Sequence, residues 1–361
     1  MHAIPRNLYV HATLVIRQTA SVQLELCKRY EAPWVRSADG QRRLHRLTDV
    51  RFSDPQIGWA IGVRQLLSTK DGGRTWRNQY PRGFERENLH IEVVHPVNSK
   101  TCWLLAPYVS HEVRCFLSED GGQNWVEKYR FFSEKYRIIH LDMFFLDAGR
   151  GWILCGEQED GPRTHLSVHS TVDGGSHWSV LPLGIGGRPR KITFADARRG
   201  WLIAGHPTKL PPDSGTTVYT TGDGGASWTP VAKLPGEVTN LYAVSQTEVF
   251  ATGWTGRLFR SIDAGSTWQA LSTRTHAILA GIHFRGPIGI AVGTLDMVLT
   301  KRSVAILATT DGGISWHRID SPICASIFYV YLTGWDRGVM ASMDALYQFR
   351  LRERRGRAAQ P

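Results

Sequence analysis

The chain has 361 residues, 42% of them hydrophobic, which is enough for one large domain or two average ones with a buried core. Its 43 Lys and Arg residues against 32 Asp and Glu residues give a formal net charge of +11, which favours an acidic partner and says nothing about the fold. No run of 18 uncharged apolar residues occurs, so the sequence predicts no transmembrane helix and leaves only peripheral association with a membrane open.

Two strand-like segments, 8–17 and 22–30, open the chain. His11 and Arg17 interrupt the apolar run of the first segment, and no small-residue cleavage site follows it cleanly, so it does not resemble a signal peptide. We therefore expect a cytoplasmic protein, with the reservation that a start assigned too far downstream would hide an export signal.

From residue 69 onward, the motif Ser/Thr-x-Asp-Gly-Gly-x-x-Trp recurs six times at intervals of 40 to 53 residues. The six aspartates are Asp71, Asp120, Asp173, Asp223, Asp263 and Asp311, and the six tryptophans are Trp76, Trp125, Trp178, Trp228, Trp268 and Trp316. Six equivalent aspartates on six separate units cannot converge on one active site. We therefore assign the aspartates and tryptophans a structural role rather than a catalytic or metal-binding one.

The motif has the chemistry of a tight turn between two strands. An Asp side chain closes an Asx-type turn by accepting hydrogen bonds from nearby backbone N–H groups, and glycine supplies positive φ. In the fifth copy Ala264 replaces the first glycine and Gly265 keeps the second. This departure predicts that the second glycine carries the strained backbone angle.

Each motif lies between the third and fourth strands of a four-stranded unit. The six predicted units span 47–80, 88–129, 137–182, 189–233, 238–272 and 277–320. Three further strands, at 326–332, 338–342 and 345–350, have no motif and no fourth strand. Four short strands every 40 to 53 residues is typical of propeller blades.

The sequence therefore predicts an all-β fold, a seven-bladed β-propeller of four-stranded antiparallel blades. The N-terminus donates the outer strand of the last blade, which hides a sheet edge that the ring would otherwise expose. The expected organisation is closing strands in 1–36, the propeller in 47–350, and a basic C-terminal tail in 351–361.

The repeated Asp-Gly-Gly-x-x-Trp motif and the Gly-Trp pairs that open the second strands, such as Gly58-Trp59, resemble the bacterial-neuraminidase (BNR, Asp-box) repeat superfamily. Within it, the stretch from Gly58 to Trp76 is similar to the photosystem II stability and assembly factor group. The resemblance covers about residues 47–350 and implies a non-catalytic, seven-bladed propeller that helps to assemble a larger complex. It does not by itself imply a photosynthetic role.

The five cysteines show no CxxC or Cys/His spacing typical of zinc sites, and their odd number argues against a full disulfide framework. We expect buried free thiols, although Cys102 and Cys115 lie on neighbouring predicted strands and their pairing stays open. His165 and His169 are four residues apart on a predicted strand, too far for a shared metal. We expect no metal site and no cofactor.

Propeller geometry places the loops between second and third strands, and the junctions between blades, on the face opposite the Asp boxes. The long segments on that loop-rich face are 157–164, 206–216, 294–303, 81–88 and 183–190. Function usually lies on such loops of a rigid scaffold. The candidate partner-binding residues are Arg82, Arg86, Arg188, Arg190, Lys209, Lys301 and Arg302. They predict a monomer that binds an acidic protein or protein complex; nucleic acid is disfavoured, because no recognition motif accompanies the charge.

The alternative is a glycoside hydrolase or glycan-binding propeller, because sialidases and some glucanases share the Asp box. Hydrolysis needs two carboxylates across a cleft, and Glu85, Asp160 and Asp213 lie on the loop-rich face without a distinctive context. A sialidase would require an Arg-Ile-Pro motif, which the chain lacks. We therefore expect a binding protein rather than an enzyme.

Overall fold

The computed structural model describes residues 22–31, 34–36, 42–44, 47–62, 64–84, 87, 89–108, 111–160, 163–184, 187–206, 215–295, 304–323, 325–343 and 345–353. Within them the regular structure is β-strand, apart from one 3-10 turn, η2 (Trp254–Gly256). The predicted strand at 8–17 lies outside the described residues.

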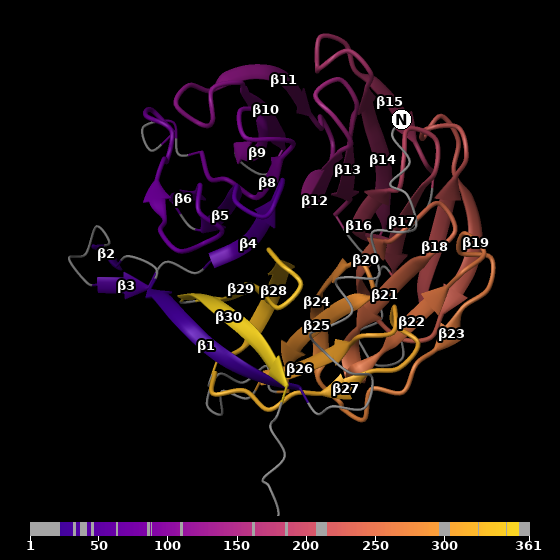
Figure 1. Cartoon of the computed structure of the whole chain (residues 1–361). Helices are drawn as coiled ribbons and strands as arrows, with labels where there is room; N and C mark the ends of the chain where they lie inside the picture. The colour runs from indigo at the N-terminus through magenta and orange to yellow at the C-terminus, as the bar shows by residue number, and fades with distance from the viewer. Residues whose placement is uncertain are drawn as a thin grey trace, which may run out of the picture.

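Seven four-stranded antiparallel sheets surround a central axis (Figure 1), which confirms the predicted seven-bladed propeller. Blade 1 contains β4 (Leu47–Phe52), β5 (Gly58–Gly62), β6 (Gln65–Thr69) and β7 (Arg77–Asn78). Blade 2 contains β8 (Val93–Pro96), β9 (Cys102–Tyr108), β10 (Glu112–Ser118) and β11 (Val126–Phe132). Blade 3 contains β12 (Arg137–Phe145), β13 (Gly151–Gln158), β14 (Thr164–Thr171) and β15 (Ser179–Pro182).

The second half of the ring repeats this order. Blade 4 contains β16 (Arg188–Phe194), β17 (Gly200–Gly205), β18 (Thr216–Thr221) and β19 (Thr229–Leu234). Blade 5 contains β20 (Val238–Ala243), β21 (Val249–Gly253), β22 (Leu258–Ser261) and β23 (Gln269–Ala270). Blade 6 contains β24 (Ile278–Arg285), β25 (Ile288–Thr294), β26 (Val304–Thr309) and β27 (His317–Arg318).

Blade 7 is built from both ends of the chain. Its strands β28 (Ile327–Leu332), β29 (Arg337–Ser342) and β30 (Ala345–Glu353) are completed by β1 (Val22–Glu31), which pairs antiparallel with β30 along its whole length (Figure 1). The predicted closure by an N-terminal strand is confirmed. β30 runs three residues past the predicted end at Arg350, and Leu351 is buried.

The segment that follows β1 does not join blade 7. β2 (Trp34–Arg36) pairs instead with β3 (Arg42–Leu44) in a separate two-stranded hairpin. The prediction that residues 1–36 as a whole close the last blade therefore holds for β1 and not for β2.

The Asp-box aspartates close their turns with both carboxylate oxygens. In blade 1, Asp71 Oδ1 accepts from the Thr69 hydroxyl at 2.8 Å and from the Thr75 N–H at 2.9 Å, and Oδ2 accepts from the Thr75 hydroxyl at 2.6 Å. Equivalent bonds from the residue four positions later lower the pKa of Asp120, Asp173, Asp223 and Asp263 to about 2. These carboxylates stabilise the turns as anions.

Both glycines of the other five Asp boxes adopt positive φ, as Gly72 (69°) and Gly73 (86°) show, and in the fifth box Ala264 adopts 60°. The prediction that the second glycine alone carries the strained angle is therefore incomplete. The second position has an additional requirement, because a Cβ at Gly175 would lie 2.6 Å from the Trp103 ring of the preceding blade. Neighbouring blades thus interlock at the second glycine.

The cysteine pairing that the sequence left open is excluded by strand register. Cys102 on β9 lies opposite Ser118, whereas Cys115 on β10 lies opposite Leu105, so the two thiols are three pairs apart along the sheet. Both are buried free thiols, and their burial raises their pKa above the ordinary value.

Candidate functional site

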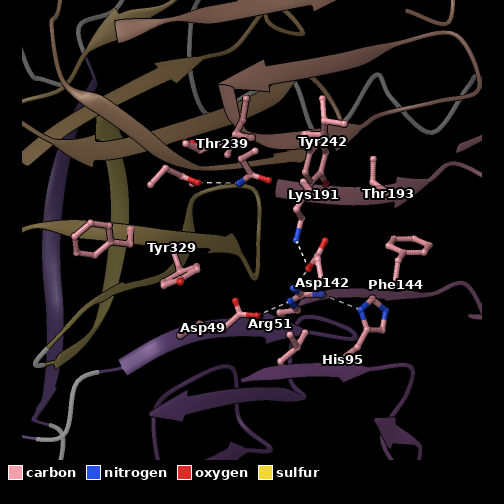
Figure 2. Close-up of a pocket in the computed structure, with 18 of the residues that line it drawn as sticks. Asp49, Arg51, His95, Asp142, Phe144, Lys191, Thr193, Thr239, Tyr242 and Tyr329 are labelled. Atoms are coloured by element: carbon pink, nitrogen blue, oxygen red, sulfur yellow. Dashed lines mark hydrogen bonds and ion pairs between the residues drawn. The ribbon is translucent and has the colours of Figure 1, made fainter. Parts of the chain in front are cut away.

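The innermost strands of the seven blades enclose a central cavity of about 590 Å³ (Figure 2). Every inner strand (β4, β8, β12, β16, β20, β24 and β28) contributes lining residues. This volume lies within the range of about 300–1,000 Å³ that is usual for ligand pockets. We refer to this cavity as the channel.

Bulges in the inner strands increase the number of side chains that reach the channel. Six of these strands skip one residue in their pairing, at equivalent levels; the skipped residues are Thr48, Ile139, Arg190, Thr239, Ala280 and Phe328. Side chains of a regular strand alternate between faces, whereas a bulge lets consecutive residues share one. Arg190 and Lys191 therefore both line the channel.

An ion-pair network crosses one side of the channel and joins blades 1, 2, 3 and 4 (Figure 2). Arg51 Nε donates to Asp49 at 2.7 Å, and Arg51 Nη2 donates to Asp142 Oδ1 at 2.9 Å. Lys191 Nζ lies 3.2 Å from the same Asp142 oxygen. The other Asp142 oxygen accepts from the Ile192 N–H at 2.9 Å. One buried carboxylate on β12 thus holds strands from blades 1 and 4.

His95 completes this network as a neutral ring. Arg51 Nη1 lies 3.1 Å from His95 Nδ1, and His95 Nε2 lies 2.9 Å from the Phe145 carbonyl oxygen. Because the guanidinium only donates and the carbonyl only accepts, the ring proton is on Nε2. Burial, with Arg51 nearby, lowers the pKa of His95 to about 3. Burial alone would raise the pKa of Asp142, but the charges of Lys191 and Arg51 lower this pKa to about 2.

The opposite side of the channel is aromatic. Tyr331 stacks on Phe52 with ring centroids 4.7 Å apart, and its centroid lies 4.0 Å from that of His283. The Tyr242 hydroxyl donates to the Phe284 carbonyl at 3.2 Å, and the Tyr329 hydroxyl donates to the Thr48 carbonyl. These backbone bonds fix the two rings in the channel wall.

The candidate partner-binding residues differ in whether they form ion pairs within the chain. Arg82 is exposed and Arg188 is half-buried, and neither has an ion pair with another described residue. Arg190 pairs with Glu237, whose side chain is only 2% exposed, so Arg190 neutralises a buried carboxylate. The remaining candidates, Arg86, Lys209, Lys301 and Arg302, lie outside the described residues.

Several carboxylates of the loop-rich face are already bound by cations of the same chain. Glu87 and Glu112 both bind Arg114, at 2.5 and 2.8 Å, and Glu159 binds His165 at 2.6 Å. Two arginines outside the predicted set, Arg64 and Arg274, are exposed and without an ion pair among the described residues. Both have positive φ, at 56° and 51°. Their position in short connections between strands or between blades is the feature of the sequence that could have identified them.

The carboxylates of the hydrolase alternative do not form a pair in the described part of the chain. Asp160 is exposed, and Glu85 and Asp213 lie outside the described residues. Within the channel, Asp49 and Asp142 are engaged by Arg51. Among the residues that the structure describes, no group of three or more His, Cys, Asp or Glu side chains is placed to hold a metal ion. The described strands and turns also include no helix long and apolar enough to span a membrane.

The sequence alone did not indicate the channel network. Each member of the network lies either three residues or one residue before the end of an inner strand. Asp49 and Arg51 occupy these two positions on β4. A charged residue at this position in a repeat whose inner strand is otherwise buried was a usable signal. Without the ring closed, nothing in the sequence paired Arg51 with Asp142, which is 91 residues away.

Comparison with known proteins agrees with this architecture. A family model described as "Photosynthesis system II assembly factor YCF48" matches residues 132–295. The photosystem II assembly lipoprotein Ycf48 of Synechococcus sp. (strain CC9902) is 28% identical over 142 residues, which is 37% of this chain and 37% of that relative.

Two solved structures show the same fold. A structure of YCF48 bound to D1 peptide has a TM-score of 0.62 at 17% identity and covers 90% of this chain and 94% of that one. The GH74 xyloglucanase of Xanthomonas campestris has a TM-score of 0.60 at 13% identity and covers 92% of this chain and 54% of that one. Because these identities are low, the structural likeness shows the fold and does not choose between the functions. The repeats, the fold and the matched segment together confirm that the chain is a BNR-type Asp-box propeller similar to the photosystem II assembly factor YCF48.

Proposed function

We propose that this chain is a non-catalytic scaffold that binds an acidic segment of a partner protein through its loop-rich face and so assists the assembly or stability of a larger complex. The similar protein from Synechococcus is named an assembly lipoprotein, and a structurally similar YCF48 was solved with a D1 peptide bound. These relatives support a protein partner.

The observation that carries the proposal is the pair of arginines on this face that form no internal ion pair. The exposed Asp160 has no ion pair among the described residues, but the carboxylates Glu87, Glu159 and Glu237 of this face are bound by cations of the same chain. Arg82 and Arg188 have no such partner among the described residues. Arginine suits this role because its planar guanidinium binds carboxylates in a bidentate manner and stays charged. The face therefore favours an acidic ligand.

A peptide-binding measurement tests the proposal. The probes are a fluorescein-labelled D1 peptide and a labelled glutamate-rich decapeptide, titrated with the full chain and followed by anisotropy. The Arg82→Glu, Arg188→Glu double variant is expected to bind at least about tenfold more weakly, a loss of about 1.4 kcal/mol. Affinity should also fall as salt rises, because exposed charges are screened over about 10 Å at 0.1 M ionic strength.

The matched control reverses two exposed cations on the opposite face, Lys70→Glu and Arg74→Glu, next to the blade 1 Asp box. It changes the net charge equally and should leave the affinity within about twofold of the original. Equal losses in both double variants would reduce the effect to net charge, and an unchanged affinity in the Arg82, Arg188 variant would contradict the proposed surface. Hydrolysis of oligosaccharides in a glycan panel would contradict the non-catalytic assignment.

A further inference from the structure

The polar groups that line the channel differ in how far their hydrogen-bonding capacity is used. Arg51 donates to Asp49, Asp142, His95 and the Met143 carbonyl, which occupies four of its five N–H groups. Asp142 accepts three hydrogen bonds. These two residues are therefore committed to holding the blades together and have little capacity for a ligand.

Lys191 is in a different situation. Its ammonium group has three N–H donors and only one acceptor among the described residues, Asp142 at 3.2 Å. Thr193 lies two positions further along β16 and also lines the channel, and its hydroxyl has no hydrogen-bond partner among the described residues. Two neighbouring polar side chains of one strand thus have unused capacity directed at the same cavity (Figure 2).

A third donor comes from blade 6. The Leu332 N–H donates to His283 Nδ1 at 3.3 Å, and burial, with Arg285 nearby, lowers the pKa of His283 to about 3. The ring is therefore neutral with its proton on Nε2, and this N–H has no partner among the described residues. Its ring centroid lies 5.3 Å from that of Tyr242 and 4.0 Å from that of Tyr331, so the donor is set within the aromatic wall.

From this arrangement we infer that the channel is a binding site for a carboxylate attached to a planar apolar group, with the carboxylate on Lys191 and Thr193 and the apolar group against Tyr242, His283 and Tyr331. The unused groups of Lys191, Thr193 and His283 are donors, one of them cationic, so these three favour an acceptor-rich anion. The rings are fixed by backbone hydrogen bonds and by stacking, so little ordering is required on binding.

The electrostatics of Lys191 are consistent with this ligand. Burial lowers the pKa of Lys191, and the nearby Arg51 charge lowers it further. Asp49 and Asp142 balance the charges of Arg51 and Lys191, and Asp142 is shared by both cations. A bound carboxylate would give Lys191 a second anionic partner and would not fill a net charge deficit.

The test uses benzoate as the probe and benzamide, which has the same shape and no charge, as its matched control. Binding to the full chain at neutral pH is measured by calorimetry and by the NMR signal of the Ala280 methyl group, which lines the channel. We expect saturable binding of benzoate at one site and at least about tenfold weaker binding of benzamide. A benzamide affinity equal to that of benzoate overturns the inference.

Variants locate the site. Lys191→Met keeps the aliphatic stem and leaves Asp142 with Arg51 and the Ile192 N–H as partners, so the chain should fold and bind benzoate at least about tenfold more weakly. Lys191→Arg should restore binding, and Lys100→Met, at an exposed turn, should not change it. Unchanged binding by Lys191→Met overturns the inference. If that variant does not fold, the absence of benzoate contacts to Ala280 in the unmodified chain overturns it instead.

Two further arms separate this site from the loop-rich face and identify the source of the ligand. The Arg82→Glu, Arg188→Glu variant should bind benzoate normally, so a failure of the peptide proposal leaves this inference standing, and the reverse also holds. N-acetylphenylalanine carries the same carboxylate and ring as a peptide terminus. Tighter binding of N-acetylphenylalanine than of benzoate indicates a chain terminus as the natural ligand, and the opposite order indicates a free small acid.

Discussion

Replacing Asp142 by Asn should destabilise the ring in a way that depends on pH. The pKa of this carboxyl falls from its ordinary 3.8 to about 2 in the folded chain, because Lys191 and Arg51 outweigh the effect of burial. A group whose pKa is lowered on folding stabilises the protein above its unfolded pKa, and this stabilisation is lost as pH falls through the folded pKa. The pKa difference corresponds to about 2 kcal/mol at neutral pH.

The full cost of Asp142→Asn should be larger than this ionic part. Asn retains an acceptor for Arg51 and Lys191, but its amide N–H₂ would face the Ile192 N–H that now donates to Asp142 Oδ2. Breaking a buried ion pair costs about 3–5 kcal/mol, so we expect a total loss of about 2–5 kcal/mol at pH 7. Part of this loss should disappear between pH 4 and pH 2, because the wild-type carboxyl becomes protonated there.

Urea denaturation of both proteins at several pH values measures this difference, since effects of the Asp-box aspartates are common to both and cancel. Asp160→Asn, at an exposed aspartate without an ion pair among the described residues, is the matched control and should change stability by less than about 0.5 kcal/mol. A deficit that stays constant from pH 7 to pH 2, or no deficit at all, would refute the assignment of Asp142 as the charge that holds blades 1, 3 and 4 together.

Two further predictions concern the ring itself. Gly122→Ala should lower thermal stability much more than Gly121→Ala. A Cβ at Gly122 would overlap the Trp59 ring, whereas one at Gly121 would lie 3.2 Å from a carbonyl oxygen, and Ala264 already occupies the equivalent first position in another box. Equal melting temperatures for the two variants would argue against blade interlocking. Deleting residues 1–36 removes the partner of β30 and should produce oligomers and a lower melting temperature, because a long edge strand is left unpaired. Size-exclusion chromatography with light scattering measures the oligomeric state, and a stable monomer would show that β1 is dispensable for closure.

The local pattern of the sequence determined the blades, their number and their closure. Each Asp box combines a carboxylate, one or two glycines and a tryptophan within eight residues, as in Thr69–Trp76, and the hydrogen bonds that it makes are nearly all local. Short-range chemistry of this kind can be recognised from one copy and becomes unmistakable in six. The missing fourth strand after β30 likewise required a donor from the N-terminus, and β1 supplies it.

Tertiary structure alone determined which residues meet in the channel and which surface charges form ion pairs. Arg51, Asp142 and Lys191 are separated by tens of residues and meet only because the ring brings the inner strands of blades 1, 3 and 4 around one axis. Whether an arginine is available to a partner also depends on long-range pairing: Arg190 neutralises the buried Glu237, whereas Arg188, two positions earlier on the same strand, has no ion pair among the described residues. Local sequence encodes turns and strands through contacts within a few residues, but the electrostatic environment of a side chain is set by charges that only the closed ring places beside it.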